Sequence, residues 1–270
     1  MYKINLENDL KKIDDVISFK NRNKYYGRIF FKSNEYVSDI LSNFDIKNKK
    51  VLTVLGSGDQ AFHFLNRGAK SVDIFDINRL SIYYYYLRIW LIKYMNEFYP
   101  NDFNYEYWIK LRNMIVTNNI DETNVIKFWN YFFDKDYKFN RLLEYDDYHC
   151  ENGIEDLTIL KNKLDSSKIK FYNFDIKSSK IKLHKKYDIL YLSNIPDWFF
   201  DFGFYNELVL FRYSNNISKL LKRKGLAIRS YVDSLSGSVI DEIQILGNCF
   251  DYDRIDSEKK LNIGHYYVKK

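Results

Sequence analysis

The sequence contains few residues that could build a disulfide framework or a metal site. Its 270 residues include only two cysteines, Cys150 and Cys249, and four histidines, with no C-x-x-C pair and no metal-ligand spacing among them. Isolated cysteines are typical of proteins in a reducing compartment, where thiols stay free. We therefore expect a cytoplasmic protein with no metal site.

The sequence also lacks a long apolar run. The N-terminal residues MYKINLENDLKK contain no apolar signal core, and the greasiest segment, residues 80–95, is interrupted by Arg88 and Lys93. A membrane-spanning helix needs about 20 predominantly apolar residues. These features predict a soluble protein with no targeting signal and no transmembrane segment.

The composition is that of a globular chain. A hydrophobic content of 46% excludes a disordered protein, and 270 residues suit a single elaborated domain. The 25 Tyr and 21 Phe accompany abundant Lys, Asn and Ile, which indicates an AT-rich genome rather than base-stacking platforms. A net charge of +6 permits contact with nucleic acid or an anionic membrane surface without favouring either.

The most informative stretch is residues 50–78, KVLTVLGSGDQAFHFLNRGAKSVDIFDIN. Residues 51–55 form a continuous apolar and β-branched run, as in a parallel strand covered on both faces. Gly56-Ser57-Gly58 then allows a sharp turn, and a helix over residues 59–66 ends before Gly68. A second strand over residues 72–75 delivers Asp76, which at this spacing can accept hydrogen bonds from the hydroxyls of a bound ribose.

The glycine turn by itself leaves the ligand open. Residues 56–61 fit the G-x-G-x-x-G/A pattern of dinucleotide sites, so the motif does not separate NAD from S-adenosylmethionine, and a plain tight turn is a third interpretation. Asp59 favours S-adenosylmethionine, because a carboxylate in the turn repels a diphosphate and suits the ammonium of a methionine moiety. We therefore predict S-adenosylmethionine, with an NAD-dependent oxidoreductase as a remoter alternative.

Later segments predict the rest of an α/β fold. Residues 169–173 form a third strand, followed by Asp175 and Ile176, which we assign to the adenine ring; an N-cap role for Asp175 is the alternative. Residues 187–192 form a fourth strand whose end, Ser193 to Trp198, should lie beside the first strand's end. Residues 226–231 form a fifth strand. Two strand-like runs, 239–246 and 265–269, suit a terminal antiparallel hairpin, which favours a methyltransferase-type sheet.

Two helical regions flank this sheet. Residues 1–45 predict an N-terminal helical cap, with one helix over residues 5–18 and another starting near Ser33 with Glu35 in its first turn. Residues 102–150 are aromatic-rich, helical in pattern and without a strand-like run. Because that length exceeds an ordinary crossover, we predict a helical insertion or lid between strands two and three that defines the acceptor pocket.

The segment GSGDQAFHFLNRGAKSVDIFDINRLSIYYYYLRIWLIKYM, together with YDILYLSNIPDWF, carries a family resemblance. It is similar to small bacterial proteins related to the S-adenosylmethionine:diacylglycerol 3-amino-3-carboxypropyltransferases of betaine-lipid synthesis. The resemblance covers residues 31–231 and implies a Rossmann-like class I methyltransferase fold. It also implies transfer of the aminocarboxypropyl group of S-adenosylmethionine to a hydroxyl.

The predicted function is accordingly a S-adenosylmethionine-dependent transferase that moves the 3-amino-3-carboxypropyl group to a small-molecule or lipid acceptor. The alternative is a methyltransferase; its nucleic-acid form is disfavoured because residues 194–198 match the N-P-P-Y segment poorly. The predicted catalytic residues are Asp197, Asn194 and Tyr191, with Asp197 as base or orienting group. The predicted cofactor-binding residues are Leu55, Gly56, Ser57, Gly58, Asp59, Gln60, Asp76, Ile77, Asn78, Asp175, Ile176, Ser193 and Asn194.

Overall fold

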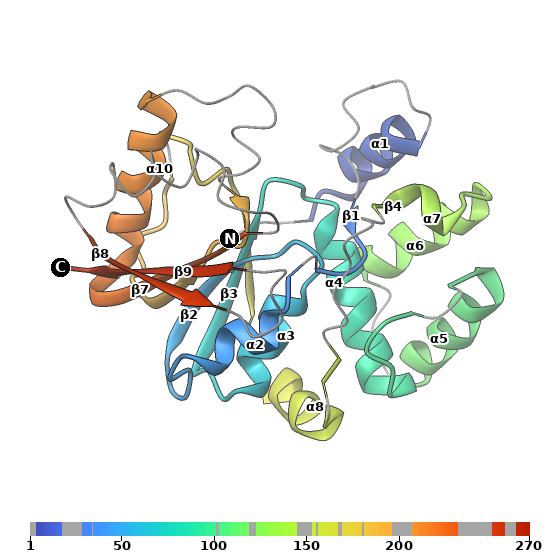
Figure 1. The fold of residues 1–270 in the computed structure, drawn as a ribbon. Coiled ribbons are helices and arrows are strands. Elements are labelled where there is room, and N and C mark those ends of the chain that lie inside the picture. The colour runs from blue at the N-terminus through green and yellow to red at the C-terminus, as the bar shows by residue number, and fades with distance from the viewer. Residues whose placement is uncertain are drawn as a thin grey trace.

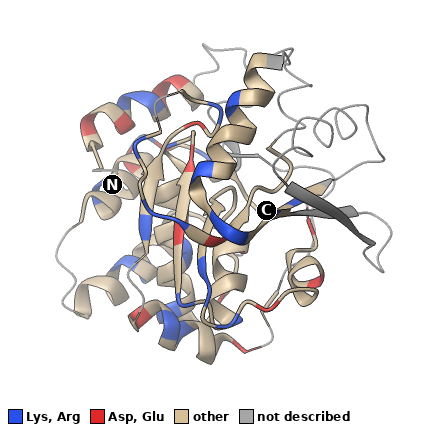
Figure 2. Cartoon of the chain, turned by 90° about the vertical axis from the view of Figure 1, so that its left-hand side faces the viewer, with Lys and Arg blue, Asp and Glu red and all other residues tan. Residues whose placement is uncertain are grey.

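The computed structural model describes residues 4–17, 29–33, 35–100, 103–118, 123–144, 153–154, 156–166, 169–179, 181–195, 207–231, 250–256 and 263–270. Figure 1 shows a sheet with helices packed on it and a helical part to one side. In Figure 2 the Lys and Arg residues are distributed over several elements rather than gathered on one. Within the described ranges, no helix is both long and apolar enough to cross a membrane.

The core of the fold is a seven-stranded sheet in the order β5-β3-β2-β6-β7-β9-β8. The first five strands in this order pair in parallel, and β9 pairs antiparallel with both β7 and β8. The strands are β2 (Lys50–Val54), β3 (Ser71–Asp76), β5 (Lys170–Asn173), β6 (Tyr187–Tyr191), β7 (Leu221–Tyr231), β8 (Phe250–Asp256) and β9 (Ile263–Lys269). This is the predicted α/β architecture: a Rossmann-like methyltransferase sheet, mostly parallel and with a C-terminal antiparallel pair.

The strand order places a switch point between β2 and β6. The chain runs outward from β2 to β3 and β5, then returns to add β6 on the other side of β2. As predicted, the carboxyl ends of the first and fourth parallel strands are neighbours, with Thr53 opposite Tyr191. Crevices at such a point are the usual ligand sites of open α/β sheets.

Helices cover both faces of the sheet, so β2 is buried on both sides. Val51 belongs to a core shared with α3 (Asp59–Asn66) and α8 (Leu157–Ser166), whereas Leu52 belongs to a second core under α10 (Glu207–Leu220). Consecutive side chains of a strand point to opposite faces, and this explains the continuous apolar run of residues 51–55. Figure 1 shows α10 on one side of the sheet and α3 on the other.

The predicted helical insertion is largely present. It contains α5 (Tyr105–Thr117), capped by Asn104, and α6 (Asn124–Asp134), capped by Thr123. Both pack around an aromatic cluster next to α4 (Ser81–Trp90) and the π-helical turn η1 (Leu91–Met95) that continues it. The expectation of no strand here is wrong, because the short helix α7 (Phe139–Leu142) is followed by β4 (Leu143–Glu144).

The N-terminal region is helical only in part. It contains α1 (Leu6–Ile17), the short strand β1 (Ile29–Phe30), which pairs in parallel with β4, and α2 (Val37–Ser42). The predicted helix start near Ser33 is therefore wrong, and Glu35 lies before α2 rather than in its first turn. Its backbone N–H donates to the Ser33 hydroxyl instead, at 3.2 Å.

Two predicted boundaries near the C-terminus also change. The fifth parallel strand begins at Leu221 rather than after Gly225, and its register with β6 shifts between Tyr187 and Ile189. The predicted strand over residues 239–246 lies outside the described residues, and the partner of β9 is instead β8. The predicted antiparallel pair at the C-terminus is present, formed by β8 and β9.

Candidate ligand-binding site

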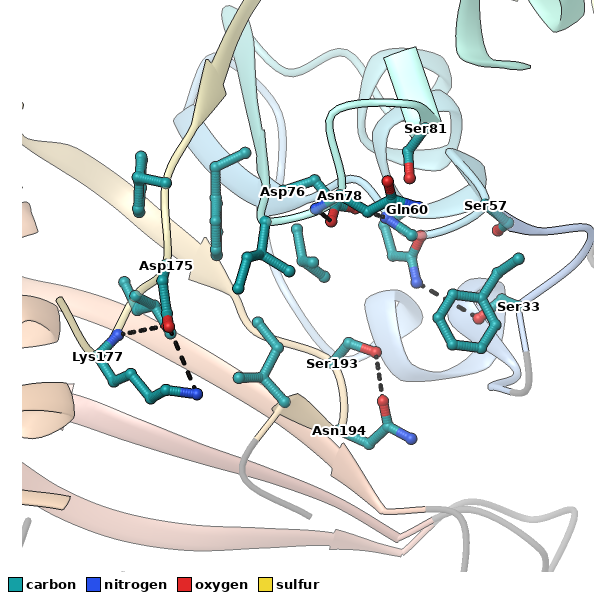
Figure 3. A pocket seen from close by; sticks show the side chains of 18 of the residues that line it. Ser33, Ser57, Gln60, Asp76, Asn78, Ser81, Asp175, Lys177, Ser193 and Asn194 are labelled. Atoms are coloured by element: carbon teal, nitrogen blue, oxygen red, sulfur yellow. Dashed lines mark hydrogen bonds and ion pairs between the residues drawn. The ribbon is translucent and has the colours of Figure 1, made fainter. Parts of the chain in front are cut away.

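A cavity lies at the carboxyl ends of β2, β3, β5 and β6. It encloses about 1100 Å³ of empty space, its open mouth included. In Figure 3 Asp175 and Lys177 lie at one end and Ser33 and Ser57 at the other, with Asp76 and Ser193 between them. The lining residues are Phe30, Lys32, Ser33, Val54, Gly56, Ser57, Gln60, Phe75, Asp76, Ile77, Asn78, Ser81, Phe174, Asp175, Ile176, Lys177, Ser193, Asn194 and Ile195.

The two glycines of the turn after β2 have different roles. Gly56, at a φ of 50°, faces the cavity, and a Cβ there would meet nothing closer than Gln60 at 3.9 Å. Gly58, at a φ of 94°, is packed so closely that a Cβ would lie 2.9 Å from the Tyr85 ring. Gly56 therefore keeps the backbone open to a ligand, whereas Gly58 allows the turn to pack on α4.

Asp59 does not line the cavity. Its side chain is fully buried and forms an ion pair with Arg88, at 2.5 Å from Oδ1 to Nη1. Its other oxygen accepts hydrogen bonds from the Tyr99 hydroxyl at 2.9 Å and the Ser33 backbone N–H at 2.8 Å. The predicted contact between Asp59 and a methionine ammonium is therefore corrected: the carboxylate is directed into the protein and is already satisfied there.

The buried Arg88 side chain supports the glycine turn from inside the protein. Its Nη1 donates to the Ser57 carbonyl at 2.9 Å, and its Nε donates to the Phe98 carbonyl at 3.1 Å. The guanidinium lies 4.4 Å from the centres of both the Phe98 and Tyr99 rings. A buried cation held by a carboxylate, carbonyls and aromatic faces is a structural support.

Asp76 stands at the end of β3 and faces the cavity. Its carboxylate accepts hydrogen bonds from the backbone N–H groups of Gly56, at 3.0 Å, and Asn78, at 2.8 Å. Burial raises the pKa of Asp76 to about 6, although these hydrogen bonds oppose the rise. The side chain ties the glycine turn to β3, and its remaining lone pairs can accept hydrogen bonds from a ligand.

One end of the cavity has apolar walls. Ile77 is 49% exposed although it is a large aliphatic residue, and it lines the cavity together with Ile176 and Ile195. The Phe75 and Phe174 rings stack behind it, with centroids 4.8 Å apart. An exposed isoleucine at the mouth of an apolar slot is suited to cover a flat ring.

Asp175 closes this apolar end. Its Oδ1 accepts from the Lys177 backbone N–H at 3.0 Å, and its Oδ2 lies 3.4 Å from Lys177 Nζ. This contact closes a turn, and the helix N-cap role that we weighed for Asp175 is wrong, because no helix begins within residues 176–179. The side chain also lines the cavity, so a ligand contact remains compatible with the turn.

The opposite end is lined by the segment after β1, which the sequence analysis missed. The side chain of Gln60 donates to the Ser33 hydroxyl at 3.4 Å, while its buried Oε1 has no partner among the described residues. Lys32 extends over the Tyr99 ring, 4.9 Å from its centre. This end thus offers an acceptor and a cation.

Helix α1 reaches the rim of the same cavity. Lys12 Nζ lies 3.5 Å from Asn78 Oδ1, and burial together with the nearby Arg79 lowers the pKa of Lys12. The helix is held in place by buried Asp9, which accepts from the Tyr83 hydroxyl at 2.8 Å and pairs with Arg79. The N-terminal helix therefore covers the edge of the site next to Asp76, as a cap would.

The turn after β6 contains an unusual backbone. Ser193 has a φ of 55°, a conformation that residues other than glycine rarely adopt. Its hydroxyl donates to Glu35, and the Tyr191 hydroxyl donates to the same carboxylate at 2.7 Å. Tyr191 is fully buried, so this predicted catalytic residue does not itself face the cavity.

The structure brings most of the predicted site residues together. Ten of them line the one cavity: Gly56, Ser57, Gln60, Asp76, Ile77, Asn78, Asp175, Ile176, Ser193 and Asn194. Leu55, Gly58, Asp59 and Tyr191 are instead part of the supporting structure and are not among the lining residues. Asp197, the predicted base, lies outside the described residues.

Comparisons with known proteins agree with the fold. The chain matches no protein-family model, and comparison with curated protein sequences found no match, so the aminocarboxypropyltransferase resemblance is not confirmed. Among solved structures, the glycopeptide N-methyltransferase MtfA complexed with S-adenosyl-L-methionine is 8% identical with a TM-score of 0.50, over 93% of this chain and 100% of that one. A TehB-like SAM-dependent methyltransferase from Corynebacterium glutamicum is 10% identical with a TM-score of 0.43, over 98% of both chains. The first of these likenesses, with the strand order, identifies the fold as that of the class I methyltransferases.

Proposed function

We propose that this protein is a S-adenosylmethionine-dependent transferase and that the group it transfers is the methyl group. The observation that carries the proposal is the convergence of four segments, each following one of four adjacent parallel strands, on one cavity. In the sheet order β5, β3, β2 and β6, they supply an apolar slot, a carboxylate, a bare glycine turn and the polar side chains of Ser193 and Asn194. Lys32, from the segment after β1, adds a cation at the far end. A nucleoside joined to an amino acid requires an apolar slot, a carboxylate, an open turn and polar groups, in this order.

The residues present fit S-adenosylmethionine along the length of the cavity. The lone pairs of Asp76 would accept from the ribose hydroxyls, and Ile77 and Ile176 would cover the adenine ring, with Asp175 at its amino group. At the other end, Lys32 would pair with the methionine carboxylate. The buried, unsatisfied Oε1 of Gln60 would accept from the ammonium, the role first assigned to Asp59.

A dinucleotide fits this chain less well than S-adenosylmethionine, although Asp59 does not exclude it. Asp59 cannot repel a diphosphate, because Arg88 compensates its charge. The sheet provides the better argument, since the antiparallel β8–β9 pair at its edge is a methyltransferase feature. MtfA, which shares this fold, was crystallised with S-adenosyl-L-methionine, and this is fold-level analogy.

The choice of methyl transfer over aminocarboxypropyl transfer follows from the correction of Asp59. The case for the aminocarboxypropyl group depended on an ammonium anchored at Asp59, which left the adjoining carbon exposed to a nucleophile. With Gln60 and Lys32 as partners, the amino-acid arm would lie along the protein wall, which would leave the methyl group as the carbon open to an acceptor. Aminocarboxypropyl transfer then depends on the sequence resemblance alone.

The chemistry asked of the protein is mainly positioning. S-adenosylmethionine supplies an electrophilic carbon on a sulfonium, so the site must hold it in line with an acceptor and exclude water. We expect a small-molecule acceptor, or a lipid that approaches from a membrane surface. Asp197, Asn194 and the neighbouring turn stay the proposed acceptor side of the site.

Product analysis tests this proposal. The purified protein is incubated with S-adenosylmethionine and a cell extract, and mass spectrometry measures S-adenosylhomocysteine and methylthioadenosine. We expect S-adenosylhomocysteine to accumulate with the unmodified protein and to return to background with Asp76→Ala. Accumulation of methylthioadenosine would instead establish aminocarboxypropyl transfer. If neither product exceeds the Asp76→Ala control, the transferase proposal fails.

A further inference from the structure

Glu35 is a buried carboxyl group one side chain away from the cavity. It is fully buried, and the Ser193 and Tyr191 hydroxyls both donate to it, the latter at 2.7 Å. Ser193 itself lines the cavity, next to Asn194. Figure 3 shows Ser193 between the apolar end and the polar end of the cavity. The Glu35 carboxyl group, which accepts from the Ser193 hydroxyl, therefore lies behind this middle part of the wall.

An irregular segment of the chain positions the Glu35 carboxyl group. Glu35 comes from the loop between β1 and α2, and it meets a residue 156 positions later at the end of β6. The Ser193 backbone takes a φ of 55° at the position from which its hydroxyl reaches Glu35. Strained backbone of this kind persists where the surrounding structure enforces it, and it is frequent at functional sites.

We propose that Glu35 makes the site selective for the sulfonium of S-adenosylmethionine over the uncharged thioether of S-adenosylhomocysteine, acting through the Ser193 hydroxyl. This inference rests on the proposed function and adds a specificity-determining residue to it. In the proposed pose the sulfur lies between the ribose at Asp76 and the amino-acid arm at Gln60. That position is the part of the cavity that Ser193 faces.

Electrostatics supplies the selectivity. A ligand atom in contact with the Ser193 hydroxyl lies within roughly 7 Å of the Glu35 carboxylate. At that separation, in a partly buried site, the attraction between a sulfonium and a carboxylate strengthens binding by about tenfold or more. When the methyl group moves to the acceptor, the S–C bonding pair stays on sulfur and the acceptor's proton leaves to solvent. The product is then neutral at sulfur and loses this attraction.

The ionisation of Glu35 sets the conditions of the test. Burial raises the pKa of Glu35, while hydrogen bonds from Ser193 and Tyr191 lower it. Because the attraction requires the ionised carboxylate, the titrations are made at several pH values, and the preference for S-adenosylmethionine should increase as the pH rises. Asp76 also titrates, but it is present in every variant compared, so at a given pH its contribution to the ratio of the two affinities is the same in all of them.

The fold offers a matched control carboxylate. Asp73 is also buried and also accepts from a β6 tyrosine, the Tyr187 hydroxyl at 2.7 Å. Asp73 lies on β3, next to the first residue of β6 and therefore at the end of β6 opposite to Tyr191, and it pairs there with Lys185. Asp73→Asn thus removes a comparable buried charge without changing the cavity, and Glu35→Asp keeps the charge at the site.

The experiment measures the dissociation constants of S-adenosylmethionine and S-adenosylhomocysteine by calorimetry, with circular dichroism as a check on folding. We expect Glu35→Gln to shift their ratio about tenfold in favour of S-adenosylhomocysteine, and Glu35→Asp and Asp73→Asn to leave it within about twofold of the unmodified protein. An unchanged ratio in folded Glu35→Gln overturns this inference alone, as does an equal shift in Asp73→Asn. If Glu35→Gln does not fold, Glu35→Leu takes its place, because this variant also removes the charge, and an unchanged ratio there overturns the inference. If the unmodified protein binds neither ligand, the proposed function fails as well.

Discussion

Asp76 is the single residue on which the proposed site depends most. Replacing it with alanine removes a charged acceptor from the ribose hydroxyls, and we expect S-adenosylmethionine to bind about 2–3 kcal/mol more weakly. Calorimetry on the unmodified protein and Asp76→Ala measures the loss. The fold should survive, because the residue ends a strand rather than filling the core. Unchanged affinity in a folded variant would remove Asp76 from the site.

The same residue gives binding a pH dependence. Because burial raises the pKa of Asp76 to about 6, the ionised acceptor is present above that pH and is lost as pH falls through it. We expect the affinity for S-adenosylmethionine to decrease as pH is lowered through 6, and the affinity of Asp76→Asn to change less over the same interval. Titrations on both sides of pH 6 measure this dependence. A pH profile shared by both proteins would assign it to another group.

The turn between β2 and α3 depends on the ion pair between Asp59 and Arg88, which local sequence patterns do not reveal. Asp59 and Arg88 are 29 positions apart, and removing one partner leaves the other charge buried. We expect Asp59→Asn to lower the free energy of unfolding by about 3–5 kcal/mol. Denaturant unfolding measures this, and the double variant Asp59→Leu, Arg88→Met should lose less than the sum of the two single changes. Strict additivity would show that the two charges are not coupled.

The two glycines of the turn separate folding from binding. Gly58→Ala combines a strained φ with a 2.9 Å approach to Tyr85, so we expect it to lower the free energy of unfolding by about 2–3 kcal/mol. Gly56→Ala should lower the free energy of unfolding by only the backbone term, about 1–2 kcal/mol, and its methyl group enters the cavity. Gly56→Ala should therefore impair ligand binding more than its stability loss explains. Equal stability losses would contradict the different packing of the two positions.

The elements that the sequence predicted best are those whose pattern is local. The helix over residues 59–66 has the predicted bounds, because the glycine turn precedes its first residue and Gly68 follows shortly after its last. Glu35 was misplaced for the opposite reason. Its segment reads as the start of a helix, but a tertiary contact with Tyr191 and Ser193 draws the carboxylate into the core. Asp59 was misassigned for a similar reason, because its partner Arg88 is distant in the sequence.

In the whole molecule, the order of the sheet was predictable from the sequence, whereas the cavity wall that follows β1 was not. Parallel strands separated by helices allow few topologies, so the alternation of the two along the chain fixed the order around β2 and β6. The cavity wall formed by Lys32 and Ser33 depends on β1 pairing with β4, two-residue strands more than a hundred positions apart. Strands that short carry no periodic signal.

Binding of S-adenosylmethionine in this cavity is tested by a calorimetric titration of the purified protein with S-adenosylmethionine and, separately, with NADH under the same conditions. We expect one site with micromolar affinity for S-adenosylmethionine and no measurable heat of binding with NADH. Binding of NADH without any response to S-adenosylmethionine would contradict this expectation.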